Sequence, residues 1–68
     1  MKIFAQRLRE LRLQQGYSQK YMAEQLHIKQ KSYSRYELAT GEPSLAILAQ
    51  LAVIFNVSAD YLIGLSEI

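Results

Sequence analysis

The sequence contains no cysteine and no tryptophan, and it has only one histidine, one proline and three glycines. Without cysteine the chain can form neither a disulfide nor a thiolate metal site, as expected for a protein of the reducing cytoplasm. The single histidine, His27, fits a turn better than a catalytic or metal-binding role, and no carboxylates are spaced for acid–base or metal chemistry on one helix face. We therefore expect that the protein is not an enzyme and that it has no metal, cofactor or small-molecule site.

Long apolar runs are also missing. The longest, from Leu45 to Phe55, is interrupted by Gln50 and is much shorter than the roughly 20 residues that a membrane-spanning helix needs. Charged residues occur within the first few positions, so we expect no signal peptide. With 68 residues, of which half are apolar and 21% are charged, the chain is predicted to be a single small cytoplasmic domain over residues 1–68.

Basic residues are absent from the second half of the chain. All eight lysines and arginines lie between Lys2 and Arg35, where the only acidic residues are Glu10 and Glu24. The remainder carries the other four acidic residues, which are Glu37, Glu42, Asp60 and Glu67. This division indicates a protein that turns its N-terminal half towards a polyanion. The alternative is a solvated helix surface with a chance asymmetry.

Apolar residues at helical spacing predict an all-α fold of five short helices. Phe4, Leu8 and Leu11 form the stripe of the first helix, and Gly16 suits its end. Serine is a favoured cap before three of the others. The expected helices run from Ile3 to Gln15, from the Ser18 cap to a turn at 27–29, from Gln30 to Leu38, from the Ser44 cap to Phe55, and from the Ser58 cap through Leu65.

Residues 18–38 are predicted to form two short helices joined by a tight turn. The second helix would turn polar and basic side chains outward, namely Gln30, Lys31, Ser32, Ser34 and Arg35. Glutamine can pair with adenine through two hydrogen bonds, and lysine or arginine can bind the N7 and O6 atoms of guanine. The segment therefore favours a helix that enters the major groove of DNA and contacts base edges.

Seven segments together resemble the Cro and lambda-repressor type of helix-turn-helix domain, the XRE family. They are Leu8 to Arg12, Gly16 to Gln19, Met22-Ala23, Leu26, Ser34 to Glu37, Glu42 to Leu45, and Val57 to Leu62. The resemblance covers nearly all 68 residues without a visible insertion. It implies a compact five-helix lambda-repressor-like domain that binds double-stranded DNA sequence-specifically, as a bacterial or phage transcriptional repressor.

The same resemblance implies a role for individual residues. The base-contacting positions of the family are occupied by Gln30, Lys31, Ser34 and Arg35. Its phosphate-contacting positions correspond to Ser18, Gln19, Lys20, Lys29 and Ser32. A structural salt bridge of the family would join Arg12 to Glu37.

Four sites depart from the family pattern. His27 stands in place of the usual turn glycine, and Lys29 in place of a serine or threonine cap. Tyr33 replaces isoleucine or valine, so its hydroxyl needs a hydrogen-bond partner or a route to solvent. Leu38-Ala39 stands where Asn-Gly is common. None of these changes removes the side chains expected to contact DNA.

The helix expected from the Ser44 cap to Phe55 is more apolar than one core face requires. Val53, Ile54, Tyr61, Leu65 and Ile68 are candidates for an exposed patch, and we predict a two-fold homodimer that would bind a palindromic operator. Burial of these residues within the domain is the alternative. A different function is also possible for this fold, that of a protein-interaction module, such as an antitoxin or anti-repressor partner, acting through this helix and the one that follows it.

Overall fold

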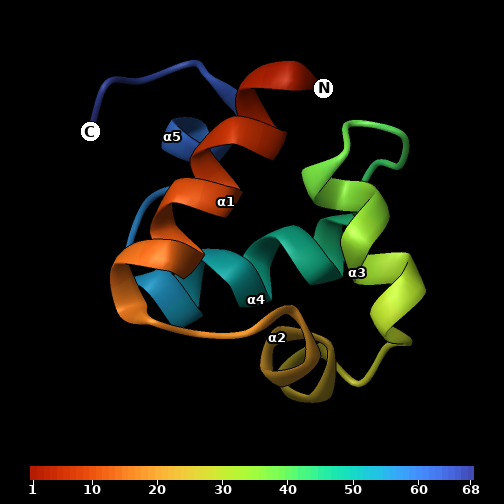
Figure 1. Ribbon diagram of the computed structural model, residues 1–68. Helices are drawn as coiled ribbons and strands as arrows, with labels where there is room; N and C mark the ends of the chain where they lie inside the picture. The colour runs from red at the N-terminus through yellow and green to blue at the C-terminus, as the bar shows by residue number, and fades with distance from the viewer.

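The computed structural model describes all 68 residues and contains five helices and no strand. The helices are α1 (Lys2–Gln15), α2 (Gln19–Leu26), α3 (Gln30–Glu37), α4 (Leu45–Phe55) and α5 (Ala59–Ile63). In Figure 1, α1 runs down one side of the molecule, α3 lies on the other, and α4 crosses between them above α2. The all-α fold of five helices predicted from the sequence is confirmed.

Three helices begin at the serine caps that the sequence predicts. The hydroxyl oxygens of Ser18, Ser44 and Ser58 accept the backbone N–H of the residue three positions on, at 2.9, 3.1 and 2.9 Å. Each bond satisfies one of the N–H groups that the first turn of a helix leaves without a partner. Lys29, which precedes α3, makes no such bond. At the start of α3, the backbone carbonyl of Lys29 accepts the N–H of Tyr33 at 3.1 Å.

Residues with positive φ terminate four of the five helices. They are Gly16 (72°), His27 (56°), Asn56 (54°) and Gly64 (89°). Gly64 corrects the expectation that the last helix continues through Leu65. The helix ends at Ile63, because Gly64 takes the left-handed conformation that a side chain disfavours and that ends helices. The third helix likewise ends at Glu37, with Leu38 as its C-cap.

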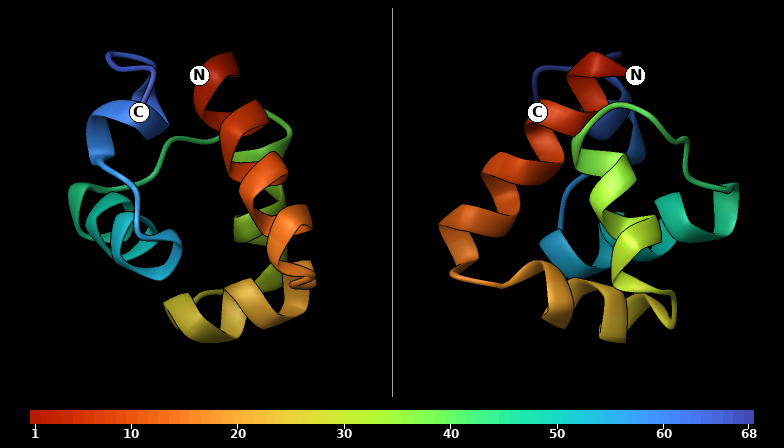
Figure 2. Two further views of the ribbon diagram at one scale, coloured as in Figure 1. Left: turned by 90° about the vertical axis from the view of Figure 1, so that its left-hand side faces the viewer. Right: turned by 45° about the vertical axis from the view of Figure 1, so that its right-hand side comes forward.

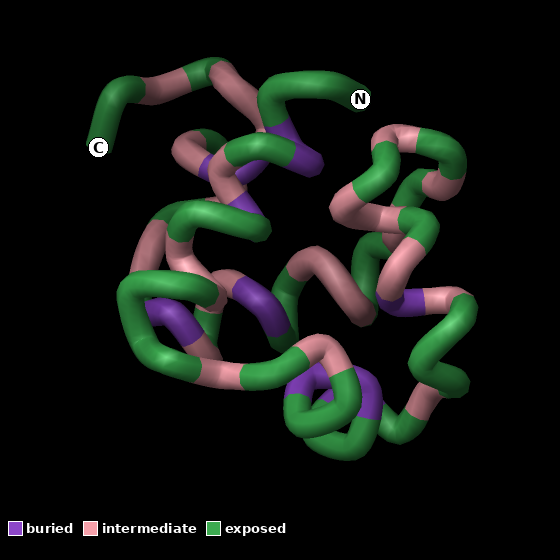
Figure 3. The backbone as a smooth tube through the Cα atoms, viewed as in Figure 1, coloured by how far each residue is buried: buried purple, intermediate pink, exposed green.

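The hydrophobic core receives side chains from every helix. Its nine members are Phe4, Leu8, Met22, Ala23, Leu26, Tyr33, Leu51, Phe55 and Leu62. Figure 3 shows the buried segments of the helices facing one another across the middle of the molecule. Because all five helices contribute to this one core, its packing fixes their mutual placement, including that of α2 and α3.

Arg7 attaches the end of the chain to α1. Its guanidinium donates to the backbone oxygens of Tyr61 and, at 2.7 Å, of Ser66, and its Cζ lies 4.3 Å from the centre of the Tyr61 ring. Nη2 also lies 3.7 Å from the carboxylate of Glu67. That carboxylate is almost fully exposed, so this ion pair contributes little. Both views in Figure 2 show the two chain ends at the same end of the molecule.

None of the five helices combines the length and the apolar character that crossing a membrane requires.

Candidate functional site

The turn between α2 and α3 determines how α3 is presented. His27 adopts φ 56° in place of a glycine, and its N–H donates to the carbonyl of Glu24 at 3.2 Å. The N–H of Ile28 then donates to the carbonyl of Ala23 at 3.0 Å. Ala23 is itself buried and belongs to the core cluster, so the turn is anchored to a packed residue. Histidine tolerates positive φ better than most residues, which permits the tight turn without glycine.

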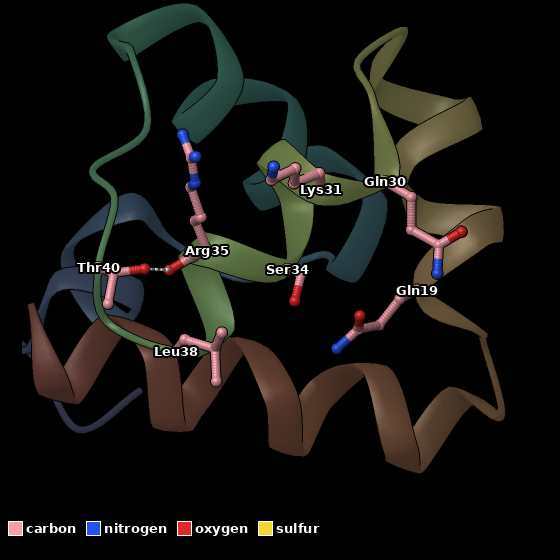
Figure 4. A pocket seen from close by; sticks show the side chains of 7 residues that line it. All are labelled: Gln19, Gln30, Lys31, Ser34, Arg35, Leu38 and Thr40. Carbon is pink, nitrogen blue, oxygen red and sulfur yellow. Dashed lines mark hydrogen bonds between the residues drawn. The ribbon is translucent and has the colours of Figure 1, made fainter.

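One face of α3 opens onto a shallow hollow of about 470 Å³ (Figure 4). Four of its lining residues, Gln30, Lys31, Ser34 and Arg35, come from α3 at spacings that place them on one side of a helix. Gln19 contributes from the start of α2. No acidic residue lines the hollow, and two of the seven lining side chains are cationic.

The other predicted DNA-contacting residues lie outside this lining. Lys20 and Lys29 are exposed near the first turns of α2 and α3, and Ser32 is half-buried on α3. Ser18 is exposed, and its hydroxyl oxygen is engaged as the cap of α2. The structure thus gathers all four predicted base-contacting residues and Gln19 at one hollow, and leaves the remaining predicted residues around it.

The carboxylate of Glu37, the last residue of α3, is enclosed beside this face and accepts four hydrogen bonds. Arg12 donates from Nε to Oε2 at 2.6 Å and from Nη2 to Oε1 at 2.9 Å. The Tyr33 hydroxyl donates to Oε2 at 2.5 Å, and the Gln19 amide donates to Oε1 at 3.1 Å. Only 3% of the Glu37 side chain is exposed. A carboxylate so enclosed is stabilised only when its oxygens are paired, as they are here.

This network shifts the pKa values of its members. Burial alone would raise the pKa of Glu37, but the hydrogen bonds from Arg12 and Tyr33 outweigh it and hold the pKa below its ordinary value of 4.5. Burial and the hydrogen bond to Glu37 raise the pKa of the Tyr33 hydroxyl. The hydrogen bond to Glu37 also raises the pKa of Arg12. The ion pair is therefore fully charged at neutral pH.

Gln19 connects the network to the hollow. Its Nε2 donates one N–H to Glu37, while the residue lines the hollow at the start of α2. An amide has a second N–H and a carbonyl oxygen, and these remain for an external partner. Glu37 thus orients a side chain that faces the candidate partner, in addition to joining α3 to α1.

Two residues of the lining, Leu38 and Thr40, are not among those predicted from the sequence to contact DNA. Thr40 returns to α3, where its N–H donates to the carbonyl of Arg35 at 3.0 Å. Its hydroxyl donates to the same oxygen at 3.4 Å (Figure 4). Leu38 follows Ser34 by four positions, so its place on the same face could have been found from helical spacing alone.

The candidate interface residues do not line one common hollow. Val53 and Ile54 border a second hollow of about 360 Å³ together with Gln25, Ala49 and Gln50. Tyr61 instead packs against Arg7. The remaining two, Leu65 and Ile68, are exposed in the C-terminal tail. Any interface that uses all five must therefore extend from α4 to the tail.

Residues 8–62 match the helix-turn-helix family. Among curated proteins of Bacillus subtilis, the chain is 41% identical over 61 residues to the SPbeta prophage-derived HTH-type transcriptional regulator YonR. It is 42% identical over 62 residues to the HTH-type transcriptional regulator ImmR. These alignments cover 90% and 91% of the chain, but only 56% and 49% of the relatives, so the chain spans about half their length. No solved structure matches.

Proposed function

The chain belongs to the helix-turn-helix family, and on that premise we propose that it binds double-stranded DNA sequence-specifically and represses transcription. The observation that carries the proposal is the outer face of α3, where Gln30, Lys31, Ser34 and Arg35 lie together without an acidic neighbour in the lining. Glutamine, lysine and arginine supply the donors and acceptors that match base edges in the major groove. Occupation of a promoter would then exclude polymerase.

Phosphate contacts would position this face on the duplex. Ser18, Gln19 and Lys20 lie at the start of α2, and Lys29 and Ser32 near the start of α3, where backbone N–H groups and the positive ends of helix dipoles favour anions. Gln19 is held by Glu37, so its remaining polar groups are already oriented before DNA binds. These contacts would strengthen binding to any sequence.

We further propose that two copies bind a palindromic operator. The surface of α4 supports this, because no charged residue occurs between Leu45 and Phe55 while Leu45 and Val53 are 85% and 80% exposed. A second copy could cover this apolar surface without burying a charge. The two α3 helices of the dimer would then enter successive major grooves about 34 Å apart.

Selection of bound sites from random duplex DNA, followed by binding measurements across salt concentrations, tests the proposal. We expect an enriched palindrome and an affinity that falls steeply with salt, because each neutralised phosphate releases a counterion. Gln19→Ala should weaken binding to every sequence by a similar factor. Absence of both enrichment and salt dependence would contradict DNA binding, and light scattering that finds a monomer at micromolar concentration and on DNA would contradict the dimer.

The hollow beside Val53 and Ile54 supports a second candidate function, that of a protein-interaction module acting through α4 and α5. The two functions predict different losses for the same variant. Val53→Asp would place a charge on the α4 surface and should abolish a protein complex. In a DNA-binding dimer it should weaken operator binding while retaining salt-dependent binding to random duplex.

A further inference from the structure

We propose that Leu38 extends the base-reading face of α3 by contacting the C5-methyl group of a thymine in each operator half-site. This inference rests on the proposed DNA-binding function and names one feature of the sequence that the protein would select. The side chain of Leu38 is apolar, so it cannot donate a hydrogen bond to a phosphate group.

Leu38 contributes little to the packing of the domain itself. Its side chain is 67% exposed, and it belongs neither to the core cluster nor to the partly buried residues packed against that cluster. Isolated exposed leucines are common on protein surfaces, so exposure alone carries no functional meaning. The position of this leucine relative to α3 provides the argument.

The backbone of Leu38 continues the geometry of α3. With φ −87° and ψ −1°, it remains close to helical, and its N–H donates to the carbonyl of Ser34 at 3.1 Å. Leu38 therefore follows Gln30 and Ser34 along the same helix face at intervals of four residues. In Figure 4 its side chain lies beyond Ser34, at the C-terminal end of α3, among the residues that line the hollow.

The following loop fixes that position. Ala39 adopts φ 62°, which ends the helix directly after Leu38, and the N–H of Thr40 returns to the carbonyl of Arg35. A Cβ atom added to Gly41 would lie 3.2 Å from the Cβ of Arg35, so the loop passes close to α3. The backbone on both sides of Leu38 is therefore hydrogen-bonded to α3.

The chemistry of the hollow identifies the partner group. Leu38 is the one hydrophobic residue among the seven that line it, so it offers an apolar contact beside polar and cationic ones. Among the base edges of the major groove, the C5-methyl of thymine is the apolar group, and side chains that lack polar atoms contact it. Leu38 is thus matched to thymine, whereas phosphate would require a donor.

Replacement of thymine by uracil tests this contact directly, because deoxyuridine lacks only the C5-methyl group. Each thymine of the selected operator is replaced in turn, symmetrically in both half-sites, and affinity is measured for the wild type and for Leu38→Ala. The wild type should lose about four-fold per half-site at one position, the factor that corresponds to ~0.8 kcal/mol for one buried carbon group. Leu38→Ala should bind the unmodified operator more weakly and show no further loss at that position.

Leu13→Ala provides the matched control. Leu13 is a leucine of α1 with 52% exposure and does not line the hollow, so this variant should retain the wild-type response to deoxyuridine. If no deoxyuridine replacement weakens the wild type, or if Leu38→Ala shows the same loss, the proposal is wrong. Either result would leave the selected operator and the DNA-binding function intact. Failure of the wild type to select any sequence would instead overturn both.

Discussion

The two sides of α3 satisfy their polar groups in opposite ways. On the inner side, Tyr33 and Glu37 are enclosed, and the Glu37 carboxylate pairs with the Tyr33 hydroxyl and with Arg12. On the outer side, Gln30, Lys31 and Arg35 are exposed at the hollow. Burying a polar group without a hydrogen-bond partner lowers the stability of the fold, whereas an exposed polar group is hydrated and stays available to an external partner. One helix can therefore hold the domain together with one side and bind DNA with the other.

The largest expected effect is a loss of stability when Glu37 loses the cation that pairs with it. Arg12→Ala removes both guanidinium bonds to Glu37 and leaves a buried carboxylate without its cation, which should lower the free energy of unfolding by about 3–5 kcal/mol. Urea denaturation measures this loss. Arg9→Ala changes an exposed arginine of the same helix and should cost less than about 0.5 kcal/mol. Equal stability of the two variants would contradict the importance of the network.

Acid should weaken this network more gently, because a protonated Glu37 keeps some of its hydrogen bonds. The folded-state pKa of Glu37 is lowered, so its contribution to stability is complete above its ordinary value of 4.5 and is lost as pH falls through the lower folded value. Denaturation curves between pH 7 and strongly acidic pH should show this loss. In Glu37→Gln the loss should be reduced, and an unchanged pH profile would exclude Glu37 as its source.

One substitution on each side of α3 distinguishes a loss of binding from a loss of stability. Arg35→Ala should reduce operator affinity by ~1–3 kcal/mol, chiefly by losing discrimination at particular base pairs, with unfolding unchanged within about 0.5 kcal/mol. Tyr33→Phe should do the reverse in stability, losing about 1.5–3 kcal/mol because it removes a hydrogen bond to a charged group. Fluorescence anisotropy with matched and mismatched duplexes, beside denaturation, separates the two effects. A stability loss in Arg35→Ala would refute the assigned division.

The smallest expected effect on stability concerns Ala39, which follows the C-cap of α3. Ala39 has φ 62°, a conformation that costs an alanine about 1 kcal/mol and a glycine almost nothing. Ala39→Gly should therefore raise the free energy of unfolding by up to about 1 kcal/mol, as measured by thermal or urea denaturation. Ala49→Gly, within α4, should instead lower it by a similar amount. A loss in both variants would exclude strain at Ala39.

Local signals predict the framework of this chain well. Each serine cap and the positive φ of Gly16 and Asn56 depend on residues adjacent in sequence, so they can be predicted without knowledge of the fold. The expected end of the last helix at Leu65 is wrong by two residues, although Gly64 is a local signal for its end at Ile63. There, the closest atom to an added Cβ would be Cγ2 of Ile3, at 3.0 Å. That crowding depends on how α1 packs and cannot be inferred locally.

The candidate site was less completely predictable. Helical spacing placed Gln30, Lys31, Ser34 and Arg35 on one face, but stopping the pattern at Arg35 left Leu38 without a role. The sequence indicates that the Tyr33 hydroxyl needs a partner, but it pairs Glu37 with Arg12 alone. In the structure Glu37 accepts from both residues. A carboxylate can accept from several donors at once, and only the relative placement of α1, α2 and α3 shows that four are within reach.

Arg7 makes the two chain ends neighbours, since it extends from α1 to the carbonyl groups of Tyr61 and Ser66. The order of the helices along the chain is therefore not essential to their arrangement in space. A circularly permuted protein could join Ile68 to Met1 through a short linker and begin within residues 40–44, ahead of α4. Such a protein would keep all five helices but would lack the covalent link between α3 and α4. Its free energy of unfolding would show how much that link contributes beyond the packing of the helices.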